Sequence, residues 1–139
     1  MHDWNRQTIE AFRANQGQVG GVWGGRPLLL LTTTGAKSGQ PHTTPVMYLR
    51  EGDRLFIFAS KAGAPTHPDW YHNLLADPVV AVEIGDQSYQ ALAKPVTGAE
   101  RDQVYARWAE QYPQFRAYQE QTPRVIPVIE LERHNGQTG

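Results

Sequence analysis

Residues 32–45, TTTGAKSGQPHTTP, bring two glycines, six hydroxyl side chains and a lysine together directly after the apolar run Leu28–Leu31. The backbone N–H groups of such a turn, with the Lys37 ammonium and the Ser38 hydroxyl, are suited to bind an anion such as a phosphate. An ordinary polar turn between two strands has the same kind of composition. The stretch by itself leaves both interpretations open.

The distribution of charge says more about this stretch than the net charge does. The 139-residue chain has a formal net charge of −1, yet residues 11–50 contain no acidic side chain, and neither do residues 54–68. If the two intervals meet in the fold, they form a local cationic surface, which suits a small anionic ligand better than a nucleic acid. A chance run of solvated charges explains the pattern equally well. The cationic side chains are Arg13, Arg26, Lys37 and Arg50 in the first interval, with His42 as a titratable addition, and Arg54 and Lys61 in the second.

Several familiar kinds of site do not match the sequence. A nucleotide-binding P-loop needs Gly-Lys-Ser/Thr followed by a helix, whereas Lys37 follows Ala36 and the next segment is extended. The five histidines lack the spacing of a metal site, the chain has no cysteine, and no serine lies in a nucleophile-elbow sequence. We therefore expect no metal ion, and an organic cofactor that carries the chemistry.

The elements that must position these residues are mainly strands. Patterns of apolar and β-branched residues predict six of them, joined as hairpins rather than as strand–helix–strand units, over residues 27–34, 42–50, 54–60, 79–84, 88–96 and 124–132. Pro127 places the last strand at an edge or a bulge, because proline cannot donate to a ladder. The pattern favours an antiparallel barrel or sheet with helices at its ends.

Capping signals predict helices over residues 3–16, 68–77, 98–111 and 114–119. Thr66 or His67 caps the second, and Thr97 with Glu100 has the spacing of a capping box at the start of the third. We therefore divide the chain into an N-terminal helix with a glycine-rich connector (1–26), a central domain (27–133) and a flexible tail (134–139).

Three stretches that follow one another in the chain resemble the deazaflavin (F420)-dependent nitroreductase family, which includes F420H2-dependent quinone reductases. They are TTTGAKSGQPHTTPV, FASKAGAPTHPDWYHNLLADP, and YPQFRAY with the closing TPRVIPVIEL. The resemblance covers roughly residues 27–132 and implies a mainly β (α+β) fold, a split β-barrel of about six antiparallel strands with helices packed at its ends. It also implies an oxidoreductase that transfers a hydride from reduced coenzyme F420 to an electron-poor acceptor such as a quinone, a nitroaromatic or an enone.

The resemblance assigns roles by position. Ser60 is the candidate catalytic residue, because it can orient the acceptor or its developing negative charge. The acceptor-side candidates are Met47, Tyr112, Phe115 and Tyr118. The cofactor-binding candidates are Ala36, Lys37, Ser38, His42, Thr43, Thr44, Pro45, Val46, Met47, Phe58, Ala59, Ser60, Lys61, Asp69, Trp70, Tyr71, His72, Asn73 and Phe115. Taken singly, several of these residues also fit a structural role, as core aromatics or solvated turn lysines.

The chain departs from the family pattern at four of these positions. Members often carry arginine in place of Ala36 and His42, so the cofactor tail has fewer permanent cations and, through His42, a pH-dependent one. Phe115 and Met47 stand where tyrosine can occur, which leaves the preferred acceptor open. Two alternatives remain: an FMN-binding split-barrel oxidoreductase, and a non-enzymatic protein that binds or sequesters F420.

The partners implied are a small-molecule electron acceptor and no nucleic acid. The longest aliphatic run, Leu28–Leu31, is too short for a membrane span, and the N-terminus lacks a secretory signal. We therefore expect a cytoplasmic protein. A peripheral contact of the N-terminal helix with the inner membrane face would let it reach a lipid quinone. The sequence does not determine the oligomeric state.

Overall fold

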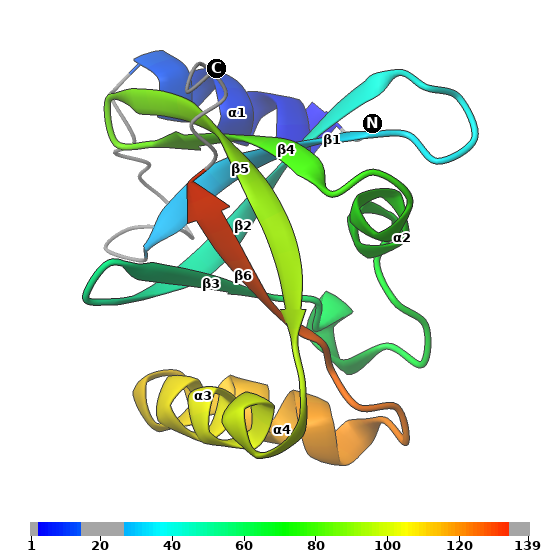
Figure 1. Cartoon of the computed structure of the whole chain (residues 1–139), viewed down its shortest axis with the longest axis vertical. Coiled ribbons are helices and arrows are strands. Elements are labelled where there is room, and N and C mark those ends of the chain that lie inside the picture. Colours follow the sequence, from blue (N-terminus) through cyan, green and yellow to red (C-terminus); the bar gives the residue numbers. More distant parts are fainter. Residues whose placement is uncertain (1–2, 15–26, 134–139) are drawn as a thin grey trace.

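The computed structural model describes residues 3–14 and 27–133, and in this part of the chain six antiparallel strands close into a barrel (Figure 1). The strand order around the barrel is β1-β2-β3-β6-β5-β4. This confirms the predicted mainly β, α+β barrel. The strands are β1 (Leu28–Thr34), β2 (Pro41–Glu51), β3 (Arg54–Phe58), β4 (Val79–Ile84), β5 (Gln87–Val96) and β6 (Val128–Arg133).

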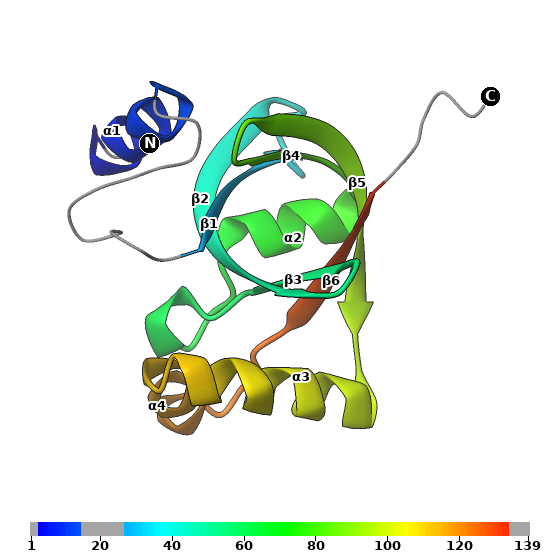
Figure 2. The same ribbon diagram turned by 90° about the vertical axis from the view of Figure 1, so that its left-hand side faces the viewer.

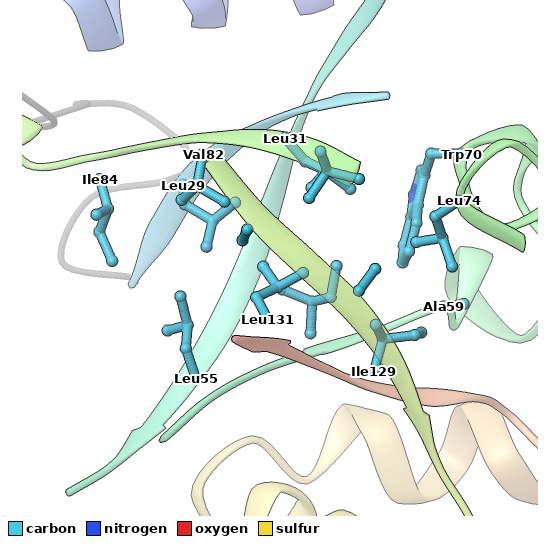
Figure 3. Close-up of a cluster of buried hydrophobic side chains, with 14 residues drawn as sticks. Leu29, Leu31, Leu55, Ala59, Trp70, Leu74, Val82, Ile84, Ile129 and Leu131 are labelled. Atoms are coloured by element: carbon cyan, nitrogen blue, oxygen red, sulfur yellow. The ribbon is translucent and has the colours of Figure 1, made fainter. Parts of the chain in front are cut away.

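Alternation along the strands gives the barrel an apolar interior and an apolar outer surface. Leu55 and Ile57 of β3 belong to the interior cluster, whereas Phe56 and Phe58 belong to a second cluster outside. Figure 3 shows the interior side chains converging from all sides, among them Leu29, Leu31, Val82, Ile129 and Leu131. The barrel is thus a packed core, and a ligand site must lie at its mouth or on its wall.

Helix α2 (Asp69–Ala76) covers one mouth of the barrel, as seen through the ring of strands in Figure 2. Its Trp70 and Leu74 point into the interior cluster (Figure 3). A single 3-10 turn, η2 (Lys61–Gly63), precedes it directly after β3. Of the described helices, α2 is therefore the one that matches the prediction of helices at the barrel ends.

The other helices pack on the outer wall. Helices α3 (Gly98–Gln111) and α4 (Gln114–Gln121) cover the second cluster, where Trp108 stacks on Phe58 with ring centroids 4.6 Å apart. Helix α1 (Asp3–Ala14) packs Ile9 and Phe12 on outward-facing leucines of β1 at the opposite side of the molecule (Figures 1 and 2). The glycine-rich connector, the tail and the predicted end of the first helix at Gln16 lie outside the described residues.

Of the two predicted helix caps, Thr97 is confirmed as the N-cap residue of α3 but its capping box does not form, and the cap predicted for α2 was wrong. Thr97 is the residue that precedes α3, but it makes no capping hydrogen bond, and the Glu100 carboxylate pairs with Arg54 at 2.9 Å instead. The N-cap of α2 is Pro68 rather than Thr66 or His67. The hydroxyl of Thr66 lies 3.2 Å from a lysine ammonium, and His67 binds an arginine.

The prediction placed the start of the last strand too early in the sequence, at residue 124. β6 begins at Val128, and the preceding Pro127 accepts a hydrogen bond from the Ala59 N–H at 3.0 Å. Since β6 lies between β3 and β5, it is not an edge strand. Pro127 is accommodated by standing just before the first residue of the ladder, where no N–H is needed.

Candidate active site

Two adjoining cavities lie between β2, the turn η2 and the helices α2 and α4. The first, about 880 Å³, is lined by the loop after β1, the start of β2 and α2, and we call it the loop cavity. The second, about 400 Å³, is lined by β2, the end of β3, η2 and α4, and we call it the aromatic cavity. Thr44 and Trp70 line both, so the two form one continuous site.

The loop cavity is built around a tight turn. The Gly39 N–H donates to the Gly35 carbonyl at 2.9 Å, and the Gly35 N–H donates to the Gln40 carbonyl at 2.8 Å. A Cβ atom on Gly35 would lie 2.5 Å from the Ser38 Oγ and 2.9 Å from the His42 Nε2. A larger residue at position 35 would therefore displace the Ser38 and His42 side chains, which line the loop cavity.

Few charges surround the loop cavity. Lys37 is exposed and makes no ion pair among the described residues, and the His42 Nε2 lies 3.4 Å from the Ser38 Oγ. Of the cationic side chains in the predicted surface, Lys37 and His42 line this cavity and Arg13 pairs with Glu83 at 2.8 Å, while Arg26 lies outside the described residues. Among the lining residues Asp69 is the only acid. The cavity can therefore hold an anion through a small number of groups.

The aromatic cavity combines a polar turn with flat apolar walls. Phe115 is buried, and its ring meets Tyr118 edge-on at 5.1 Å between centroids. Its carbonyl accepts a 2.5 Å hydrogen bond from the Tyr105 hydroxyl. Burial raises the pKa of this hydroxyl to about 12, so it remains a donor at neutral pH. The anchored backbone keeps the Phe115 ring in the cavity wall.

At the other side of the aromatic cavity, Ser60 and Lys61 form the start of η2. Lys61 has a φ angle of 47°, a left-handed conformation that is uncommon for a residue with a Cβ atom. Ser60 is buried and makes no capping hydrogen bond to the turn. Ser60 and Lys61 therefore line one end of a largely apolar cavity, and the Lys61 ammonium lies 3.2 Å from the Thr66 hydroxyl.

Comparison with known proteins decides the family. Residues 4–133 match the sequence profile described as F420H(2)-dependent quinone reductase. The chain belongs to this family. It is 43% identical over 128 residues to an F420H(2)-dependent quinone reductase of Mycobacterium tuberculosis, a match that covers 88% of this chain and 85% of the relative.

Two solved structures resemble this member of the F420H(2)-dependent quinone reductase family. An F420-H2 dependent reductase (FDR-A) is 42% identical with a TM-score of 0.70, and the match covers 77% of this chain and 95% of that one. A protein solved as a domain-swapped dimer is 38% identical with a TM-score of 0.72, and the match covers 94% of this chain and 98% of that one. Both agree with the barrel described above.

Most residues that the family resemblance singled out line the two cavities. Ala36, Lys37, Ser38, His42, Thr43, Thr44, Asp69, Trp70, His72 and Asn73 line the loop cavity. Thr44, Pro45, Val46, Met47, Phe58, Ser60, Lys61, Trp70, Phe115 and Tyr118 line the aromatic cavity. Residues far apart in the sequence thus meet in one site.

Three of the singled-out residues line neither cavity. Ala59 is fully buried in the barrel interior, and Tyr71 packs against the same interior cluster. Tyr112 packs on Trp108, with ring centroids 4.6 Å apart. Conversely, Gly35, Pro68 and Gln114 line the cavities but were not singled out. Each directly precedes a residue that was singled out, so extending each motif by one residue would have found all three.

Proposed function

We propose that this chain transfers a hydride from reduced coenzyme F420 to a quinone-type small-molecule acceptor. The observation that carries the proposal is the junction of the two cavities at Thr44 and Trp70. One cavity is polar and is lined by Lys37, and the other is largely apolar with aromatic walls. This pairing matches a cofactor that has an anionic tail at one end and a flat ring at the other.

The groups of the loop cavity fit an anionic tail. The turn closed by the Gly39 N–H leaves the N–H groups of residues 36–38 without an acceptor inside the turn, as at the start of a helix. The Ala36 N–H donates a hydrogen bond to the Oδ1 atom of Asn73 at 3.0 Å. We assign anion binding to the N–H groups of Lys37 and Ser38, the Ser38 hydroxyl and the Lys37 ammonium, with His42 as a titratable neighbour.

The groups of the aromatic cavity fit a flat ring with an acceptor beside it. When bound, reduced F420 supplies a hydride. We assign Trp70, Phe58 and Phe115 to holding the ring and excluding water. Met47 and Tyr118 shape the acceptor side, and Tyr112 supports them through its contact with Trp108. We assign the Ser60 hydroxyl and the Lys61 ammonium to stabilising negative charge on an acceptor oxygen.

The test is a binding comparison followed by turnover. Purified protein is titrated with F420 and with FMN by fluorescence, and oxidation of reduced F420 is then followed with a soluble naphthoquinone. We expect F420 to bind more tightly than FMN and the rate to saturate with quinone. Tight FMN binding with no F420 binding would refute the proposal in favour of a flavin enzyme. F420 binding without turnover on any quinone would leave a carrier protein.

Contact with a membrane through α1 stays a prediction. None of the described helices has the length and apolar character needed to cross a bilayer. Ile9 and Phe12 of α1 are already buried against Leu28 and Leu30, so they can reach a lipid surface only if α1 leaves the barrel. Flotation with quinone-loaded liposomes tests this, and protein that stays in solution argues against it.

A further inference from the structure

Arg124, in the loop between α4 and β6, binds both sides of the turn η2. Its Nη2 donates to the Ser60 carbonyl at 2.7 Å, its Nη1 to the Ala59 carbonyl at 3.1 Å, and its Nε to the Ala64 carbonyl at 2.9 Å. The Nη1 atom also lies 2.9 Å from the Nδ1 of His67. One planar guanidinium therefore joins four residues of the segment 59–67.

This arginine has no carboxylate partner among the ion pairs of the described residues. Burial lowers the pKa of its guanidinium, yet arginine remains cationic in proteins. The Nδ1 of His67 must therefore accept the hydrogen bond, with the imidazole neutral and its proton on Nε2. The hydrogen-bond acceptors of this partly buried charge are mainly backbone carbonyl oxygens. We therefore infer that the charge stabilises the conformation of this backbone.

The backbone that Arg124 holds carries two side chains of the aromatic cavity. The Ser60 carbonyl accepts from Arg124 and also from the Gly63 N–H at 2.9 Å, which closes η2. Lys61 follows with its left-handed φ of 47°. The directions in which the Ser60 and Lys61 side chains leave the backbone thus depend on the conformation of η2, which Arg124 stabilises through hydrogen bonds.

We propose that Arg124 is a positioning residue for the reaction, because it sets where the Ser60 hydroxyl and the Lys61 ammonium stand in the aromatic cavity. The catalytic meaning of this inference rests on the proposed function. The contact between Arg124 and the turn η2 does not depend on that function and is tested separately.

Arg124→Met removes the four contacts, and Arg124→Lys keeps the charge but cannot bind all four acceptors at once. Arg101→Met is the matched control. Arg101 is also largely buried and donates to a carbonyl of the same loop, that of Ile126, at 2.9 Å and 3.1 Å, but it lines neither cavity. Should Arg124→Met fail to fold, Arg124→Lys is compared with the control in the same way.

We expect both methionine variants to melt at a lower temperature, while only the Arg124 change alters the turn. Hydrogen exchange at the Gly63 amide should become faster. The pKa of His67, followed by NMR, should rise, since burial and the neighbouring charges of Arg124 and His72 hold it below its usual value. With quinone, kcat should fall by roughly 10- to 100-fold with a smaller change in KM, because the polar groups are misplaced rather than lost.

Unchanged Gly63 exchange and an unchanged His67 pKa in Arg124→Met would overturn the inference. Equal effects of Arg101→Met and Arg124→Met on kcat would also overturn it, since they would mean general loosening of the fold. If the wild-type protein does not bind F420, the proposed function fails, and the exchange and NMR measurements still decide whether Arg124 positions the turn.

Discussion

The Oδ1 atom of Asn73, on α2, accepts a hydrogen bond from the backbone N–H of Ala36 at 3.0 Å. The other end of the same side-chain amide donates from Nδ2 to the Thr33 hydroxyl at 3.2 Å. One amide therefore joins the helix that covers the barrel mouth, the end of β1 and the loop after it. Because α2 also carries Trp70, the two cavities are positioned by one helix.

Asn73→Ala is expected to loosen the loop and weaken cofactor binding. Two hydrogen bonds are lost, one of them to the buried Thr33, so the free energy of unfolding should fall by about 1–3 kcal/mol. The dissociation constant of F420 should rise by roughly tenfold if the released loop must be ordered on binding. Urea unfolding and fluorescence titration measure the two effects.

Thr33→Val is the matched control for this prediction, because it removes the contact with Asn73 but leaves the bond to Ala36. We expect it to lower stability with little change in F420 affinity. If both variants weaken binding equally, the bond to Ala36 does not control the loop.

Lys37→Ala tests the assignment of the loop cavity to an anionic tail. Lys37 is exposed and has no ion-pair partner in the described part of the chain, so its loss should leave stability nearly unchanged. A charge-assisted contact to the tail would make F420 binding weaker by roughly 1–2 kcal/mol, and less so at high salt. Lys94→Ala, which breaks a surface ion pair between Lys94 of β5 and Glu132 of the neighbouring strand β6, is the control. Equal affinity in both variants would make Lys37 an ordinary solvated lysine.

The strands were predictable because their signal is local. The run VVAVEI lies between a proline and a Gly-Asp turn, and β4 has the predicted bounds, Val79–Ile84. The caps were not predictable, since each depends on a distant partner. Glu100 has the spacing of a capping box, but Arg54, 46 residues earlier in the chain, binds its carboxylate in the fold. A local rule cannot weigh that competition.

In the candidate site, too, some residues could be predicted from the local sequence and others could not. The loop at Lys37 and Ser38 is visible in the sequence because glycines and hydroxyls cluster there. Arg124 was not singled out, because its acceptors in residues 59–67 are 57 to 65 positions away. Likewise, two neighbours in the chain just after β3 have different surroundings: Ala59 lies in the barrel interior, whereas Ser60 lines the aromatic cavity. Only the tertiary fold shows which side each residue takes.

His67 should make the free energy of unfolding fall as the pH drops below 6.5. Burial, Arg124 and His72 lower its pKa in the folded state from the ordinary 6.5, so its contribution to stability is present above pH 6.5. As the pH falls, the unfolded chain takes up a proton first, and this contribution is lost as the pH passes through the lowered folded-state pKa. Glu51 and Glu130 also have lowered pKa values, but they act below pH 4.5, in a separate window.

His67→Asn keeps an acceptor near the Nδ1 position and removes the titration. The free energy of unfolding, measured in urea from pH 5 to 7.5, should therefore vary less with pH than in the wild type. A slope that survives in His67→Asn would place the pH dependence elsewhere.

We expect Lys61 to favour cofactor binding or turnover while lowering the stability of the folded protein. Its left-handed φ of 47° costs a residue with a Cβ atom about 1–2 kcal/mol, and the extra freedom of glycine in the unfolded chain offsets about 0.5–1 kcal/mol of that. Lys61→Gly should therefore raise the free energy of unfolding by at most about 1 kcal/mol, because the loss of the weak contact between its ammonium and Thr66 reduces the gain. The same change removes the cation from the aromatic cavity, so F420 affinity or kcat with quinone should fall several-fold.

Lys61→Arg, which keeps both the charge and the Cβ atom, should match the wild type in stability and retain most activity. A glycine variant that is more stable and fully active would show that this strained lysine serves neither the cofactor nor the acceptor.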